Sequence, residues 1–242
     1  MIKFFRKIRQ NLIMENKSGK YIKYAIGEIF LVMIGILLAL QVNNWNEGRK
    51  LKQTEISLLK ELRSDLLFSK NEMDIILAGN SRQVKLYKKI NSYIEKDLPY
   101  NNELDSAFVE IDKWSAPYIP TITYENLKNI GIDIIQNDSL KRQIVKAYEL
   151  DFKLLLVEQG KWEWSFSQNT TQRIMNENIR QSIEFELATP NDFEKLKKDP
   201  IFMNFLSTLI LIRDSHVNTA QETKKSITSL LEHINQELES RQ

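Results

Sequence analysis

The chain contains 242 residues, of which 42% are hydrophobic and 27% are charged, and it has no cysteine. These proportions are those of a folded protein, and disulfides, thiolate nucleophiles and cysteine-ligated metal sites are excluded. Only 7 Gly and 5 Pro occur, so turns are few and long helices are favoured over a many-stranded sheet.

The net charge of +2 is distributed unevenly along the chain. Residues 1–24 hold seven basic side chains and a single acidic one, Glu15, so the rest of the chain is acidic on balance. The basic residues stop where an apolar run begins. This pattern indicates a membrane topology and argues against nucleic-acid binding.

The apolar run covers residues 25–42, in which Glu28 is the only charged side chain. As a helix it measures roughly 27 Å, and extending it back to Ile22 matches the roughly 30 Å hydrocarbon core of a bilayer. Trp45 follows where interfacial aromatic residues are favoured, and residues 29–40 lack the polar face of an ordinary core helix. We therefore predict a transmembrane helix over residues 22–42.

A cleaved signal peptide is the alternative, because a basic region again precedes an apolar one. No clean small-x-small cleavage site follows, however: residues 37–39 come nearest, and Leu37 is poor at the first position. An uncleaved anchor is the preferred interpretation. The excess of Lys and Arg before the anchor predicts that residues 1–21 stay cytoplasmic and that residues 43–242 face outward.

The cytoplasmic segment has a pattern of its own. Ile2, Phe5, Ile8 and Leu12 recur at helical spacing, and the basic side chains fall mostly on other faces. This predicts a short amphipathic helix that lies on the anionic membrane surface. A disordered basic leader that only sets the orientation is the alternative.

Small residues and one acid share a face of the predicted span. Glu28, Gly35 and Ala39 fall within about 20° of one another on a helical wheel, and small residues let two membrane helices approach closely. We expect this face to contact a second copy or a partner membrane protein, with the lipid bilayer around the rest. Glu28 either takes part in that contact or reaches interfacial water near the positive N-terminus of the helix.

After the span, residues 46–97 repeat apolar side chains at helical spacing, with gaps at Ser69 and Asn80. This predicts a long helix, broken at Pro99, that the pattern allows to be continuous with the span. A short helix over residues 104–114 follows, then a Pro-rich stretch, and then a second short helix closed by Gly131. The apolar stripe of the long helix comprises Leu51, Leu58, Leu62, Leu66, Met73, Ile76, Val84, Tyr87, Ile90 and Ile94.

The next long helix begins at an N-cap, Asn137 or Asp138, and its pattern runs to about Phe185. The chain turns near Pro190, and the last helix begins at Pro200 with Asp199 as its cap. No run of alternating β-branched residues competes with these helices, so we predict an all-α protein in which the anchor is followed by an elongated antiparallel helical bundle. The predicted buried seam of the last helix comprises Phe202, Phe205, Leu209, Ile212, His216, Thr223, Ile227, Leu230, Ile234 and Leu238.

Catalytic motifs are missing: the chain has no GxGxxG, P-loop, HExxH or GxSxG sequence. His216 and His233 are too far apart on one helix to share a metal, and His216 fits a hydrogen-bonded core position better than a ligand or base. Trp162 and Phe166 share one helical face, with Trp164 off it; core or interface packing is favoured over an aromatic ligand site. We predict no catalytic, cofactor or metal site and no enzyme.

Two blocks carry a family resemblance: "GKYIKYAIGEIFLVMIGILLALQVNNWNE", residues 19–47, and "YENLKNIGIDIIQNDSL", residues 124–140. They resemble the domain of unknown function family numbered 6090, uncharacterised bacterial single-pass membrane proteins. The resemblance implies an inner-membrane protein with a periplasmic body, and it provides no activity or site residues to transfer.

A binding role follows as the expectation, either as an interaction or scaffold component of the cell envelope or as a sensor-like module that signals through a partner. The sensor requires a pocket in the bundle, for which Trp162, Trp164 and His216 are the candidates. An enzyme is the least favoured class, and converging acids in a polar cleft would be its signature.

Overall fold

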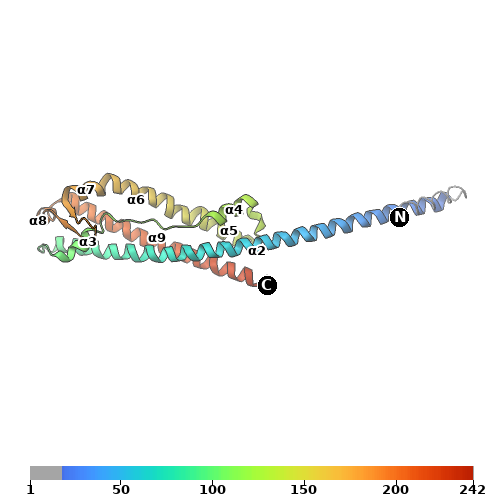
Figure 1. The fold of residues 1–242 in the computed structure, drawn as a ribbon, viewed down its shortest axis with the longest axis horizontal. Coiled ribbons are helices and arrows are strands. Elements are labelled where there is room, and N and C mark those ends of the chain that lie inside the picture. The colour runs from blue at the N-terminus through green and yellow to red at the C-terminus, as the bar shows by residue number, and fades with distance from the viewer. Residues whose placement is uncertain (1–17, 242) are drawn as a thin grey trace. The chain divides into compact units, whose positions relative to one another are not determined.

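The computed structural model describes residues 18–241. The chain divides into an N-terminal unit, Met1–Glu55, and a second unit, Ile56–Gln242, which we call the body. Helix α2 (Ser18–Glu95) begins in the first unit and ends in the second (Figure 1). The apolar segment and the long helix after it are therefore continuous, an arrangement that the sequence pattern allowed.

In the N-terminal unit, α2 exposes its apolar side chains. Ile29, Leu31 and Val42 are each more than half exposed, and none of the apolar window is buried. By length and composition this helix is able to cross a membrane, whereas a core helix of a soluble protein would bury one face. The amphipathic helix predicted over residues 1–14 lies outside the described residues.

The body is largely helical. In the body, the second half of α2 lies alongside α9 (Pro200–Glu239) and a long helical stretch that begins at Asp138 (Figure 1). That stretch alternates between α-helical and wider π-helical turns. Its segments are α5 (Asp138–Lys146), η3 (Ala147–Asp151), η4 (Leu154–Gln159), α6 (Gly160–Phe166), η5 (Ser167–Thr171) and α7 (Gln172–Asn178).

Two hydrophobic clusters form the core of the body, and buried polar residues separate them. On α2 the first cluster extends to Ile76 and the second begins at Tyr87; on α9 the second cluster ends at Ile212 and the first resumes at Ala220. Between these levels lie the side chains that we call the polar layer: Asn80, Gln83, Glu110, Glu163 and Arg213.

Most residues of the predicted stripes are buried, but Ile94, His216 and Leu238 are only partly buried. The seam of α9 is confirmed from Phe202 to Ile234 except at His216, and the stripe of α2 is confirmed from Leu58 to Ile90. The prediction that Leu51 is buried is wrong, because Leu51 is 56% exposed and precedes the body.

Short elements connect α2 to α5: η1 (Asn102–Leu104), α3 (Asp105–Phe108), α4 (Ile122–Ile130) and η2 (Ile132–Ile134). The helix predicted over residues 104–114 is thus too long, since α3 ends at Phe108. An extended connector, residues 113–121, follows it. Gly131 ends α4 with φ of 114°, a conformation that favours glycine, so this predicted terminus is confirmed.

The predicted helix caps are also confirmed. The Asn137 side chain accepts hydrogen bonds from the backbone N–H groups of Ser139 and Leu140 at the start of α5, and its amide donates to Glu237 Oε2 at 2.7 Å. Asp199 accepts from the Ile201 N–H at the start of α9, where Pro200 occupies the first turn. Both side chains satisfy donors that the first helical turn leaves without partners.

The helix predicted to continue to Phe185 ends instead at Asn178, and a hairpin follows that the sequence analysis missed. Strand β1 (Ile179–Gln181) pairs antiparallel with β2 (Ala188–Pro190). The hairpin brings Ile179 and Ala188 into the second hydrophobic cluster, and this burial overrides a helical pattern that is only local. The four-residue helix α8 (Phe193–Leu196) then leads into α9.

Candidate functional site

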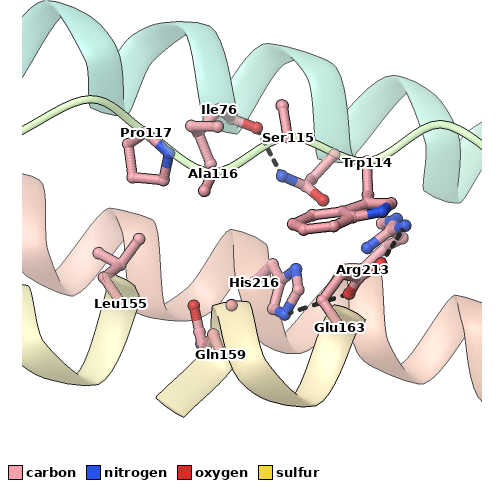
Figure 2. Close-up of a pocket in the computed structure, with 12 residues that line it drawn as sticks. Ile76, Trp114, Ser115, Ala116, Pro117, Leu155, Gln159, Glu163, Arg213 and His216 are labelled. Atoms are coloured by element: carbon pink, nitrogen blue, oxygen red, sulfur yellow. Dashed lines mark hydrogen bonds and ion pairs between the residues drawn. The ribbon is translucent and has the colours of Figure 1, made fainter. Parts of the chain in front are cut away.

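A small cavity lies at the level of the polar layer, where α2, the connector, α6 and α9 meet (Figure 2). Its free volume of about 20 Å³ is room for about one water molecule. We call it the central cavity. Its lining comprises Ile76, Asn80, Trp114, Ser115, Ala116, Pro117, Leu155, Gln159, Gly160, Glu163, Arg213 and His216.

A buried ion pair forms one wall of the central cavity. Arg213 Nη2 donates to Glu163 Oε1 at 2.7 Å, and the two side chains are only 2% and 5% exposed. Within the described part of the chain, Glu163 Oε2 and Arg213 Nε have no hydrogen-bond partner. Charges withdrawn from water to this degree are tolerated only because they are paired, so neither residue is replaceable alone.

The ion pair also holds the connector. The Lys113 carbonyl oxygen accepts from Arg213 Nη2 at 3.3 Å and from Gln83 Nε2 at 2.8 Å. Tyr87 donates to the Glu110 carbonyl oxygen at 2.6 Å, and burial raises the pKa of its hydroxyl well above the usual range. Side chains of α2 and α9 therefore fix the start of a segment that has no secondary structure of its own.

His216 is the third polar group at this wall. Its Nε2 lies 3.9 Å from Glu163 Oε2, and its side chain is 16% exposed. Burial lowers the pKa of the imidazole; the Glu163 charge opposes this shift and the Arg213 charge reinforces it. His216 is therefore neutral at pH 7, and 3.9 Å is too long for a direct hydrogen bond to Glu163.

Figure 2 shows how these groups converge: Glu163, Arg213 and His216 turn toward one another, with Trp114 of the connector over them. The gap between Glu163 Oε2 and His216 Nε2 suits a bridging water that accepts from one group and donates to the other. Ser115 lines the same cavity, but among the described residues no hydrogen bond joins it to His216.

A larger depression, broadly open to solvent, lies between the η4–α6 segment and α9, and we call it the Trp162 cavity. Its volume is about 540 Å³. Gln159 and His216 line both this cavity and the central one, so these two side chains form a shared wall. Its lining comprises Gln159, Trp162, Thr208, Leu211, Ile212, Ser215 and His216.

The Trp162 ring is braced by aromatic stacking. It lies parallel to the Phe166 ring at 5.2 Å, and Phe166 in turn stacks on Phe205 at 5.9 Å. Trp162 nevertheless remains 48% exposed. One indole face is thus fixed by packing while the rest of the ring is available to the cavity.

Of the three residues that the sequence suggested for a pocket, Trp162 and His216 do line the same cavity. Trp164 does not join them: it packs edge-on against Trp114 at 6.5 Å. His233 lies elsewhere, with its ring nitrogens at 2.9 Å from Gln143 Oε1 and 3.3 Å from Asn137 Nδ2. In residues 18–241 no group of three His, Asp or Glu side chains is arranged to hold a metal.

Sequence reasoning missed Glu163 and Arg213, the most deeply buried charged pair of this site. Some signal was present, because Arg213 follows Leu209 by one helical turn within the seam of α9, and Glu163 stands between two tryptophans. It also missed the π-helical segments η4 and η5 on either side of α6. Such widened turns re-aim side chains and occur often at functional sites.

In the N-terminal unit, the predicted contact face is exposed. Gly35 and Ala39 are both exposed, and a Cβ added to Gly35 would meet no other atom within 4 Å. Glu28 is intermediate in exposure. The described chain therefore leaves room for a second helix at this face.

A family model described as Family of unknown function (DUF6090) matches residues 28–161. The match covers most of the apolar segment, the rest of α2, the connector and the chain as far as the start of α6. Comparisons with curated proteins and with solved structures gave no match.

Proposed function

The chain belongs to this family of unknown function, DUF6090, and we propose that it is a membrane-anchored protein that acts by binding a partner in the bacterial cell envelope, as an interaction or scaffold component. One observation carries the proposal. An apolar window of α2 in which no residue is buried is continuous with a helix of a folded body, as expected of a tether.

The basic residues before the window favour a cytoplasmic N-terminus and a periplasmic body. Long amphipathic helices joined by short connectors favour an antiparallel bundle, and the two hydrophobic clusters that α2 and α9 share support this arrangement. The partner contact is proposed at the Gly35 and Ala39 face, where small side chains permit close helix packing.

We propose a non-enzymatic role because the polar groups of the body neutralise one another. The buried carboxylate of Glu163 is paired with Arg213. In the described lining of the central cavity, no second acid accompanies Glu163 to form the acid–base pair that many enzymes use. An ion pair with a neutral histidine beside it is suited to holding a structure or a ligand.

Site-specific photo-crosslinking in native membranes tests the proposal. A photoreactive residue at Gly35 is expected to capture a specific protein, identified by mass spectrometry, whereas the same probe at Ile34, on another face of the helix, captures far less. Equal capture at both positions, or capture at neither and at no exposed body position such as Trp164, would contradict a binding role through this surface.

A second candidate function is a sensor-like module that binds a small ligand and signals through the partner. The specific observation in its favour is the Trp162 cavity, which contains two of the three residues that the sequence analysis assigned to such a pocket. Ligand-dependent change in the crosslinking pattern at Gly35 would separate this candidate from a passive scaffold.

A further inference from the structure

The lining of the Trp162 cavity has a definite chemical character. Thr208 and Ser215 contribute hydroxyl groups and Gln159 contributes an amide, while Leu211 and Ile212 contribute apolar surface. No Asp, Glu, Lys or Arg is present in this lining, and His216 is neutral there. The volume of about 540 Å³ lies in the range of small-molecule sites, roughly 300–1,000 Å³.

The aromatic platform adds a geometric preference. Trp162 is held from one side by Phe166, so its ring does not need to be ordered when a ligand arrives, which lowers the entropic cost of binding. A flat apolar ligand face packs well on such a ring. The Gln159 amide already donates to Thr219 and the Thr208 hydroxyl to the Asn204 carbonyl, so their oxygen atoms remain as acceptors for hydroxyl groups of the same ligand. Covering these oxygens without supplying donors would be costly.

Behind the cavity lies a buried acceptor without a partner. Glu163 Oε2 has no hydrogen bond within the described chain, and it lies 3.9 Å from the His216 ring that forms the shared wall. Both side chains line the central cavity, whose 20 Å³ are room for about one water molecule that could bridge them. A ligand that bonds to His216 is thereby connected to the buried ion pair and to the Lys113 carbonyl that it holds.

We propose that the Trp162 cavity is a binding site for an uncharged, hydroxyl-rich small molecule of the sugar class, with its apolar ring face on Trp162 and its hydroxyl groups on Gln159, Ser215 and His216. A charged ligand finds no counter-charge in this lining, and a purely apolar ligand would leave the polar groups unsatisfied. The inference rests on the second candidate function, and it specifies the ligand class of that function.

The test is calorimetric titration of the full chain in lipid nanodiscs with maltose and with N-acetylglucosamine. Glucoside and maltoside detergents must be avoided throughout, because their head groups belong to the proposed ligand class. At least one of the two sugars is expected to bind with a Kd below about 1 mM, and glucuronate, a charged sugar of similar size, is expected to bind at least about tenfold more weakly.

Matched variants locate the site. Trp162→Ala is expected to weaken binding by about tenfold or more. Trp164→Ala, the same change two residues away on a side chain that is 59% exposed and outside the cavity, is expected to leave the Kd unchanged. Leu211→Trp narrows the cavity from a position that is 70% exposed, so it blocks binding without disturbing the core, which circular dichroism verifies.

Three results would overturn the inference: no heat from either sugar at millimolar concentration, binding that survives both Trp162→Ala and Leu211→Trp, or glucuronate binding as tightly as the neutral sugars. These outcomes are separate from the partner proposal, because the Gly35 crosslinking does not involve this cavity. A failed titration with intact crosslinking rejects the ligand alone.

Discussion

Removal of one partner from the buried ion pair is the sharpest test of how the body is held together. Arg213→Met keeps the length of the side chain but leaves the Glu163 carboxylate buried without its cation. With both side chains at most 5% exposed and 2.7 Å apart, breaking such a pair costs about 3–5 kcal/mol of folding free energy. For a domain of this size, that corresponds to a decrease in Tm of about 6–20 °C.

The assay is thermal and urea unfolding of the full chain in nanodiscs, followed by circular dichroism and tryptophan fluorescence. The double variant Glu163→Met with Arg213→Met is the control: it places two apolar side chains where the charges were, and its stability is expected to be closer to that of the unmodified chain than that of Arg213→Met. If Arg213→Met lowers stability by less than about 1 kcal/mol, the pair is not desolvated and the reasoning fails.

Three further predictions concern other parts of the chain. Burial lowers the pKa of folded His216 below the usual histidine value of about 6.5, so the unfolded chain binds more protons and stability falls as the pH drops below about 7. In His216→Gln this part of the loss, measured by urea unfolding, should disappear, and an unchanged dependence of stability on pH would contradict the prediction. Gly35→Leu should weaken association in a membrane dimerisation assay and Ile34→Leu should not. Equal effects of the two substitutions on association would show that the Gly35 and Ala39 face is not the contact surface. A periplasm-dependent reporter fused after Gln242 should be active and one fused after Lys17 inactive, and the reverse pattern would refute the orientation.

The elements that the sequence predicted correctly are those determined by local chemistry. The caps at Asn137 and Asp199 and the terminus at Gly131 each depend on residues within one helical turn of one another, and the apolar run of residues 25–42 is a feature of composition alone. The seam of α9 was also readable, because a 40-residue helix repeats its period often enough to outweigh single exceptions.

The hairpin was missed because its reason is not local. Residues 179–185 have a pattern that a helix accommodates, and the observed strands are only three residues each. What selects the strands is burial of Ile179 and Ala188 against a hydrophobic cluster built by α2 and α9. Phe185, with φ of 54°, then takes a strained turn position that the sequence gives little reason to expect.

The candidate site was half predictable for a similar reason. Trp162 and His216 were recognisable as unusual residues on apolar faces, so they were named, whereas Glu163 and Arg213 were not singled out. Only the approach of α6 to α9, fifty residues apart in sequence, converts these two into a buried pair. The sequence showed that Asn80 interrupts the apolar stripe of α2, but it did not show why. The structure gives the reason, because Asn80 belongs to the polar layer.

The polar layer also explains how these long helices settle on one alignment. Apolar stripes alone permit more than one alignment of the helices, because sliding α9 along α2 by one turn replaces one leucine or isoleucine contact with another. The same slide would carry Arg213 into a hydrophobic cluster and leave Glu163 without its cation, which costs several kcal/mol. The clusters on either side therefore provide stability, while the charged pair between them restricts that stability to one register. Because the pair also holds the connector through the Lys113 carbonyl and faces His216, the alignment of the body and the wall of the Trp162 cavity depend on the same few side chains.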